Sequence, residues 1–225
     1  MTAHRSKHPR RLSILVASTL AVLSLGACSL RGNGTEAVDT RELDSFDAID
    51  LGGAFELVVH VAPGDAQRVE VRGDENIVPK ITTKVSDGEL AIGLDHWMVR
   101  PDLPMKIEIW VPSLTAIDAS GAADIEVEGL HGERFELDVS GASDTTLAGD
   151  IASLEVDSSG ASKLDARSLH AKTVEIELSG AGEAQIWASE SLDAEISGAG
   201  KIRYWGEPVL VSKDVSGAGS IEAAH

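Results

Sequence analysis

Acidic residues recur at one fixed place in a repeated motif. The tripeptide Ser-Gly-Ala occurs six times, and an acidic residue stands three positions before each of its glycines: Asp118, Asp138, Asp157, Glu177, Glu195 and Asp214. Carboxylate oxygens are the ligands that Ca²⁺ prefers, so an aligned row could bind Ca²⁺ weakly. The same row could serve only as a solvated face that discourages aggregation. Both interpretations stay open, and we expect no other cofactor or firm metal site.

Two tryptophans, Trp187 and Trp205, stand seven residues after successive glycines of the motif. If both project from the same face, their indoles form a flat platform with Arg167, Gln185 and Arg203 around it as hydrogen-bond donors. An aromatic surface with a polar rim suits the apolar face and hydroxyl edge of a sugar. The alternative is that a terminal loop or a second subunit of a homo-oligomer covers the rings.

The histidines predict no catalytic or metal site. His131 and His170 share a register but lie two repeats apart, about 10 Å, which is too far to share a metal ion. We therefore expect them to be solvated loop residues.

The first 27 residues predict a lipoprotein signal peptide. An apolar stretch from 12 to 25 ends in Leu25-Gly26-Ala27-Cys28, which resembles the bacterial lipobox, and it follows a basic segment that contains Arg5, Lys7, Arg10 and Arg11. Cleavage before Cys28, the only cysteine, would leave a thiol to carry a lipid. We expect a protein exported across the inner membrane and anchored by that lipid. Because Ser29 follows the cysteine, the outer membrane is expected in a cell with two membranes.

The charge of the chain excludes one class of partner. The signal segment holds four of the 19 basic residues and none of the 37 acidic ones, so the remainder carries a formal charge of −22. Nucleic acid and anionic headgroups would repel such a protein. Contact with a membrane should therefore depend on the lipid anchor.

The spacing of the motif predicts the fold. Its glycines, Gly121, Gly141, Gly160, Gly180, Gly198 and Gly217, are 18 to 20 residues apart, which is typical of a solenoid. Before and after each glycine, apolar residues alternate with polar ones, the period of a strand with one buried face. Each repeat should therefore hold two strands that meet at the Ser-Gly-Ala corner. Stacked repeats would pair strand on strand.

The rest of the chain divides into two parts. Residues 28–45 are polar and glycine-containing, and predict a lipidated cysteine followed by a flexible tether. Residues 46–112 read as strands that precede the repeats of 113–225, with β-rich runs at Ala54–Ala62, Gln67–Arg72, Glu89–Leu94 and Met105–Val111 and a short helical turn within 74–81.

Three features together resemble a known bacterial family, the "putative autotransporter adhesin head GIN domain". They are the Ser-Gly-Ala repeats, Ile109-Trp110-Val111-Pro112-Ser113-Leu114 just before them, and Ile202-Arg203-Tyr204-Trp205-Gly206-Glu207-Pro208 near the end. The resemblance covers residues 46–222. It implies a right-handed β-helix in a secreted or lipid-anchored envelope protein, and it brings no catalytic residues. With the six repeats counted above, the expected fold is all-β, a right-handed β-helix of about six coils of 18–20 residues after β-rich entry strands.

The function expected from the sequence is a lipid-anchored envelope module that binds or scaffolds, with adhesion to a glycan, a surface or an envelope protein implied by the resemblance. An enzyme is not expected, because no catalytic constellation is found. Two alternatives stay open. One is a calcium-dependent polysaccharide lyase or hydrolase, and the other is a purely structural spacer of the envelope.

Overall fold

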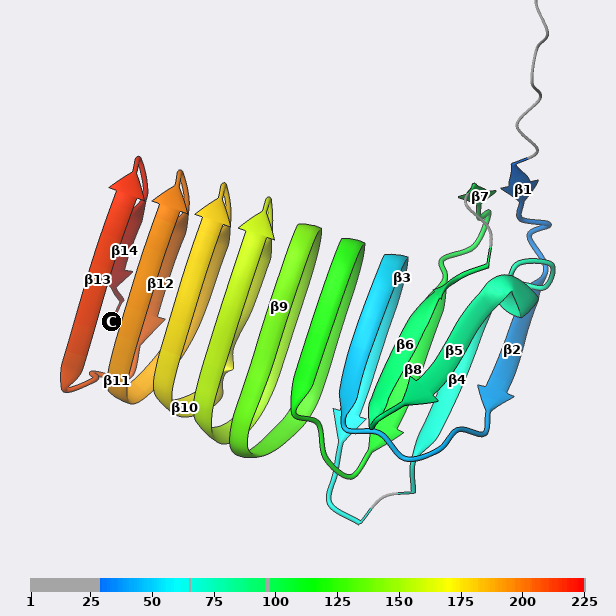
Figure 1. Cartoon of the computed structure of the whole chain (residues 1–225), viewed down its shortest axis with the longest axis horizontal. Coiled ribbons are helices and arrows are strands. Elements are labelled where there is room, and N and C mark those ends of the chain that lie inside the picture. The colour runs from blue at the N-terminus through cyan, green and yellow to red at the C-terminus, as the bar shows by residue number, and fades with distance from the viewer. Residues whose placement is uncertain (1–28, 65, 96–97, 225) are drawn as a thin grey trace, which may run out of the picture.

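The computed structural model describes residues 29–64, 66–95 and 98–224, and in these ranges the chain is all-β (Figure 1). A single 3₁₀ turn, η1 (Val78–Lys80), interrupts the strands. No helix within these ranges is long and apolar enough to cross a membrane. The strands are β1 (Leu30–Arg31), β2 (Glu36–Arg41), β3 (Ala48–Val61), β4 (Arg68–Asp74), β5 (Ile81–Ser86), β6 (Glu89–Leu94), β7 (Val99–Arg100), β8 (Lys106–Val111), β9 (Ala116–Gly160), β10 (Lys163–Gly180), β11 (Glu183–Gly198), β12 (Lys201–Trp205), β13 (Leu210–Gly217) and β14 (Ser220–Ala223).

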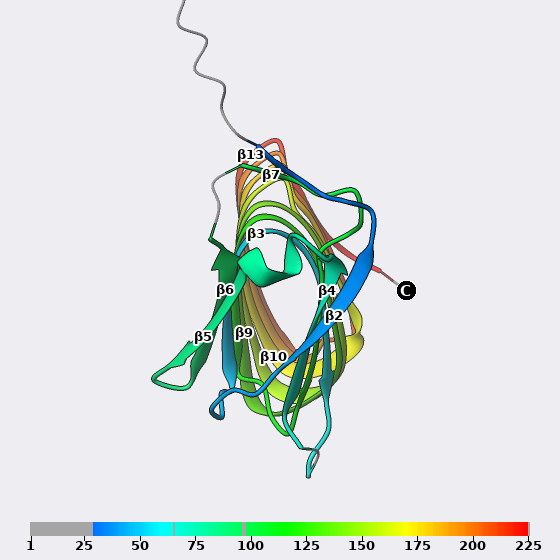
Figure 2. The ribbon, with the colours of Figure 1, turned by 90° about the vertical axis from the view of Figure 1, so that its right-hand side faces the viewer.

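The Ser-Gly-Ala glycines stack on one another in parallel register. Gly180 is the partner of Gly160 on one side and of Gly198 on the other, and Gly198 is the partner of Gly217. We call the stretch of chain around each such glycine a rung and name it by its glycine. In Figure 1 the rungs lie side by side along the molecule, and in Figure 2 they overlay as nested loops around a common interior.

The apolar alternation of each rung fills that interior. Leu178 and Ile196, two residues before their glycines, are partners in register and are almost fully buried. Ile176 and Ala194, four residues before, are buried in the same way. The acidic residues between them point outward and are exposed. Period-two patterning and stacking at the repeat length therefore place the core where the sequence predicts it.

The stack begins earlier in the chain than the sequence analysis predicts. Gly53, within β3, is the partner of Gly121, and Asp50 is the partner of Asp118. Residues 46–112 are expected to hold strands that precede the Ser-Gly-Ala repeats, and one of them, β3, stacks in register on the first repeat. The Gly53 rung cannot be recognised from the spacing, because residues 62–115 separate it from the next rung. Gly52 also replaces the serine of the Ser-Gly-Ala motif.

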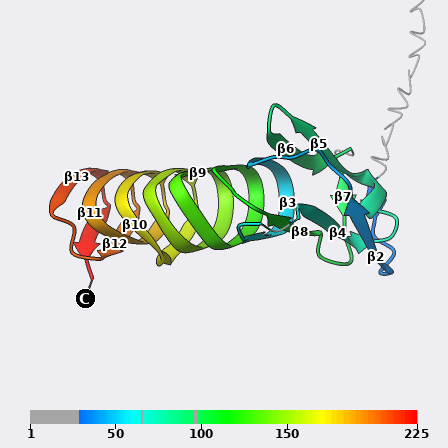
Figure 3. The same cartoon turned by 90° about the horizontal axis from the view of Figure 1, so that it is seen from below.

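The inserted strands close the N-terminal end of the sheet. β6 and β8 pair in parallel with β3, and β4 pairs antiparallel with β8. β2 then pairs antiparallel with β4 and forms the edge, while the short β5 pairs with β6. Figure 3 shows these strands gathered at one end of the stack, opposite β13 and β14.

Residues 30–41 are folded, although the sequence analysis expects a flexible tether there. β2 lies in the sheet, and the buried carboxylate of Asp74 accepts backbone N–H bonds from Gly34 (2.6 Å), Asp102 (2.9 Å) and Leu103 (3.0 Å). Polar composition predicts flexibility, but pairing of β1 with β7 and of β2 with β4, together with the bond from Gly34 to Asp74, satisfies backbone groups of the segment. The predicted signal peptide and Cys28 lie outside the described residues.

The C-terminal end of the stack is open. Val211 and Val215 of β13 stand at inward register positions, yet each is 42% exposed, whereas Leu192 and Ile196 in the previous rung are 2% and 0% exposed. Lys213 stands between the two valines, four residues before its glycine, where the other five repeats carry an apolar residue. Its Nζ donates to the carbonyl of Ile221 (3.4 Å) and lies 4.6 Å from the ring centre of Tyr204. The lysine therefore lies across the open end.

Candidate functional site

The six predicted carboxylates form a continuous outward row, which we call the acidic row. Glu177 is the partner of Asp157 and of Glu195, and Glu195 is the partner of Asp214. Asp50 in the Gly53 rung extends the row beside Asp118, a member that the sequence analysis missed together with its rung. Like charges therefore stand about one strand spacing, about 4.8 Å, apart along this face.

Crowding in the acidic row disfavours ionisation at three members. Partial desolvation raises the pKa of Asp118, and the charges of Asp138 and Asp50 raise it further. Desolvation likewise raises the pKa of Asp138, with a contribution from Asp157. The pKa of Glu177 is raised mainly by the charges of its two neighbours in the row, Asp157 and Glu195. In the described part of the chain, no three His, Cys, Asp or Glu side chains gather closely enough to hold a metal ion.

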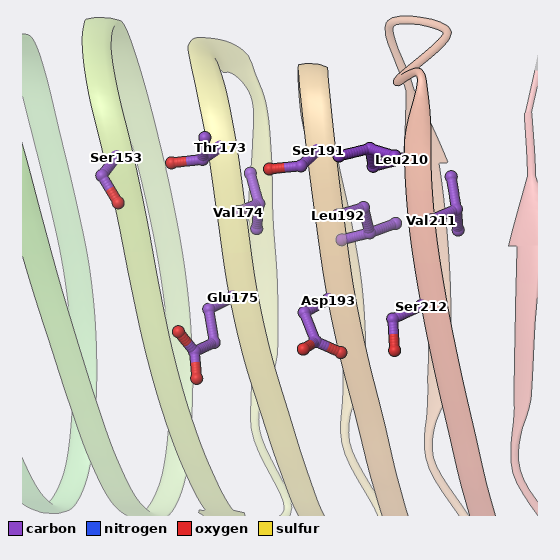
Figure 4. Close-up of a pocket in the computed structure, with 10 residues that line it drawn as sticks. All are labelled: Ser153, Thr173, Val174, Glu175, Ser191, Leu192, Asp193, Leu210, Val211 and Ser212. Carbon is purple, nitrogen blue, oxygen red and sulfur yellow. The ribbon is translucent and has the colours of Figure 1, made fainter.

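Beside the acidic row lies a shallow groove of about 470 Å³ (Figure 4). Glu175 and Asp193 occupy equivalent places on neighbouring strands, and the hydroxyls of Thr173 and Ser191 lie in register next to them. Glycan cleavage needs one carboxyl group that donates a proton and another that stays ionised. Two carboxylates at equivalent positions of a repeat lack that difference in environment, so this groove offers no acid–base pair.

The two predicted platform tryptophans are neighbours. Trp187 of β11 is the partner of Trp205 of β12, and Gln185 is the partner of Arg203 two residues earlier. Both indoles are half-buried, so each keeps a solvent-accessible part. The guanidinium of Arg167 lies 5.9 Å from the ring centre of Trp205. The two tryptophans and the three residues expected around them therefore come from adjacent rungs.

His170 is exposed, as expected, but it lies in a strand and its ring packs against the platform. The centres of the His170 and Trp187 rings are 4.7 Å apart, with their planes inclined by 57°. Counting residues from the glycine placed Arg167 beside Trp187. The register between β10 and β11 shifts at this point. Ala166 is the partner of Ile186, but the partner of the next residue, Trp187, is His170. The extra residues between 166 and 170 bulge out of register, and no local spacing signal in the sequence marks such a bulge.

A hollow of about 410 Å³ adjoins this edge of the platform. Trp187 and His170 line it together with Lys172, Asp150 and Glu133. His170 Nδ1 lies 3.3 Å from a carboxylate oxygen of Asp150, and both side chains are exposed. The platform thus continues into a concave surface with polar walls. We call the set formed by Arg167, His170, Gln185, Trp187, Arg203 and Trp205 the aromatic surface.

The remaining described tryptophan is enclosed by its neighbours. Trp110 of β8 stacks on His60 of β3, with ring centres 5.4 Å apart, and the Arg68 guanidinium of β4 lies 3.7 Å from its ring centre. Because β8 lies between β3 and β4, the two partners cover opposite sides of the indole. Trp110 is half-buried like Trp187 and Trp205, but it stands alone between His60 and Arg68, whereas the aromatic surface places two indoles side by side.

Comparison with solved structures places this arrangement among known folds. A crystal structure from Bacteroides fragilis, described as a "putative adhesin", is 26% identical, with a TM-score of 0.72 over 87% of this chain and 100% of that one. A "putative lipid binding protein" from Parabacteroides distasonis is 21% identical, with a TM-score of 0.58 over 88% and 100%. A "putative adhesin" from Parabacteroides merdae is 21% identical, with a TM-score of 0.54 over 88% and 99%. The latter two show the fold alone.

No curated protein matches the chain. A family model does match residues 45–208, which include the Gly53 rung, the inserted strands and most of the rungs that follow. It covers well over half of the chain and includes both tryptophans of the platform. The chain therefore belongs to the family described as "Putative auto-transporter adhesin, head GIN domain".

Proposed function

We propose that this protein is an adhesin-type binding module of the cell envelope that holds glycan on its aromatic surface. The observation that carries the proposal is the in-register pair Trp187 and Trp205, half-exposed on one face. The description of the family and of the Bacteroides fragilis relative as adhesins supports the same class of function and a location at the cell surface or envelope.

The chemistry of the aromatic surface fits a sugar. The two indoles offer apolar area to the C–H face of a pyranose ring, and an ordered platform loses little entropy on binding. Gln185 and Arg203, beside the indoles, supply donors for the hydroxyl groups. The hollow beside Trp187 offers a place for a second sugar unit.

The aromatic surface is tested by titrating the soluble protein from Ser29 with a glycan library and following tryptophan fluorescence. We expect bound glycan to quench the fluorescence, and the double change Trp187→Ala with Trp205→Ala to abolish binding while the protein stays folded. Glu126→Ala, on the same face of the Gly121 rung, is the matched control and should bind normally. If no glycan binds, or if the double variant binds as well as the wild type, the proposal fails and a structural spacer is left.

We further propose that a lipid on Cys28 anchors the module. The support is the lipobox-like Leu25-Gly26-Ala27-Cys28 and the basic, then apolar, segment before it. β1 begins at Leu30, so such an anchor would hold the folded N-terminal end directly at the membrane surface. Wild type should incorporate labelled palmitate and partition into detergent, and Cys28→Ser should do neither. Equal partitioning of the two forms would contradict the anchor.

We also infer that the rungs wind as a right-handed β-helix, with the Gly53 rung added to the six coils of the sequence repeat. The parallel pairing of successive rungs supports this, since crossovers between parallel strands of one sheet are right-handed in nearly all proteins. An experimental structure of the soluble domain would test the hand and the number of coils.

A further inference from the structure

We propose that the glycan held by the aromatic surface is acidic, and that Arg203 binds its carboxylate. This inference rests on the proposed function, because it assumes that a sugar occupies the two indoles. It identifies the chemical class of the ligand and the residue that selects it.

The charge differs between the two faces of the same rungs. On the strand before each glycine, the outward residues are the carboxylates of the acidic row. On the strand after the glycine, the outward positions of the Gly160, Gly180, Gly198 and Gly217 rungs are mixed in charge. Four are basic, Lys163, Arg167, Lys201 and Arg203, and three are acidic, Asp165, Glu183 and Glu222. The face that carries the indoles is therefore not uniformly acidic, although the protein has a formal charge of −18.

Two of these cations are already neutralised by neighbouring carboxylates. Arg167 donates from Nε to Asp165 at 2.9 Å and forms a second contact through its terminal nitrogen. The Lys201 ammonium lies 3.0 Å from Glu222, and its hydrogen bond lowers the pKa of that carboxyl group. Their charges are largely committed within the protein.

Arg203 differs from both. Glu222 is its neighbour in register on β14, but that carboxylate is bonded to Lys201. Within the residues that the structure describes, Arg203 forms no ion pair and no side-chain hydrogen bond, and its side chain is partly exposed. A planar guanidinium with uncommitted donors matches a carboxylate in two-point geometry.

The position of Arg203 suits a uronic acid on the platform. Arg203 and Trp205 are two residues apart on one strand and point the same way, so their Cα atoms lie about 7 Å apart. Trp187, in the preceding rung, is the partner of Trp205, so the two strands there lie about 4.8 Å apart. A sugar ring stacked on the indoles would therefore extend its C6 carboxylate from the ring edge toward the guanidinium.

The net negative charge of the protein does not prevent this binding. At physiological salt the screening length is about 8 Å, so carboxylates on the opposite face contribute little at the aromatic surface. The carboxylates on the indole face are nearer to the ligand. Asp165 is paired with Arg167 and Glu222 with Lys201, whereas Glu183 lies in register between Lys163 and Lys201. Among the cations next to the indoles, Arg203 forms no ion pair, although its charge contributes, after the hydrogen bond from Lys201, to the lowered pKa of Glu222. Two other cations near the platform have no ion pair among the described residues. Lys163 lies in the Gly160 rung beside Glu183, and Lys172 lines the hollow next to Trp187.

The test compares acidic glycans with neutral forms of the same shape. Oligogalacturonate and alginate oligosaccharides, each beside its carboxyl-reduced form, are titrated into the soluble protein, and the quenching of tryptophan fluorescence gives Kd. We expect at least one acidic glycan to bind about tenfold more tightly than its reduced form, the difference that about 1.4 kcal/mol provides. Arg203→Gln should remove that preference and leave the affinity for the reduced form unchanged, while Lys163→Gln should behave as the wild type.

The outcomes separate this inference from the proposed function. If acidic and reduced forms bind equally, or if Arg203→Gln keeps the preference, the glycan-binding proposal stands and the assignment of an acidic ligand is wrong. If no form binds, or if binding survives the loss of both tryptophans, the proposed function fails and this inference fails with it.

Discussion

The α-carbon of Gly160 faces the carbonyl oxygen of Gly141 so closely that a Cβ on Gly160 would overlap that oxygen. The same relationship recurs along the stack, from Gly121 over Gly53 to Gly217 over Gly198. The corner glycine also has a positive φ, +114° at Gly160, which side chains disfavour. The Ser-Gly-Ala repeat thus records a steric requirement of rung stacking.

Gly160→Ala should destabilise the protein strongly, because it adds both a backbone overlap and an unfavourable φ. We expect the free energy of unfolding to fall by about 3 kcal/mol or more. Gly52→Ala is the control, since its φ is not in the left-handed region and a Cβ there would come no closer than 3.8 Å to another atom. Urea unfolding of both variants measures the difference, and equal midpoints would contradict tight corners.

Asp74→Asn should loosen the N-terminal segment. The amide would set N–H donors against the backbone donors that the carboxylate now accepts, so we expect a loss of about 3 kcal/mol. Hydrogen exchange should show faster exchange at Gly34, Asp102 and Leu103. Unchanged protection of these amides would show that Asp74 does not hold the segment.

The same residue should contribute to acid sensitivity. Burial by itself raises the pKa of Asp74, but the backbone N–H bonds from Leu103, Gly34 and Asp102 outweigh it and hold the pKa below the ordinary value of 3.8. A lowered pKa in the folded state gives stability that is present above the ordinary value and is lost as the pH falls through the lowered one. The stability advantage of wild type over Asp74→Asn should therefore shrink below about pH 4. A difference that is constant with pH would contradict this.

Neutralising the middle of the acidic row should stabilise the protein at neutral pH. The pKa values of Asp138 and Glu177 are raised, so the folded state takes up protons more readily there, and stability falls as the pH rises through the raised values. Asp138→Asn, Asp157→Asn and Glu177→Gln together should raise Tm at pH 7 and weaken the fall in Tm as the pH rises past the ordinary values of 3.8 for Asp138 and 4.5 for Glu177. A lower Tm would show that the row is not a source of repulsion.

The same triple variant tests the acidic row for cation binding. Millimolar Ca²⁺ raises Tm only if it binds the native state preferentially. If the row is a solvated face, Ca²⁺ should change Tm equally in wild type and variant. A rise in the wild type that the variant loses would show that the row holds cations.

Lys213→Ile should promote self-association at the open end. The lysine stands between the exposed Val211 and Val215, and an ammonium at an inward position of an edge strand discourages pairing with another chain. We expect the variant to associate at lower concentration than wild type in size-exclusion chromatography with light scattering. Lys163→Ile, on an inner rung, controls for added hydrophobicity. If the two variants behave alike, the open end is not the contact.

The sequence determined the repeating part of the fold. The alternation around Leu178 and Ile196 and the spacing from Gly160 to Gly198 are sufficient to place the core, the outward acidic row and the pairing of Trp187 with Trp205. Each of these features follows from one residue pattern repeated at one interval, so a count along the chain maps directly onto register.

Only the tertiary structure decided the features that depend on distant or irregular pairing. The Gly53 rung meets Gly121 across the inserted residues 62–115, and the segment before β2 is held by Asp74, forty residues from Gly34. His170 replaces Arg167 beside Trp187 because a bulge shifts the register within one rung. Insertions, long-range hydrogen bonds and bulges change which residues meet without changing the local pattern, because the free energy that selects them comes from contacts between segments far apart in the chain.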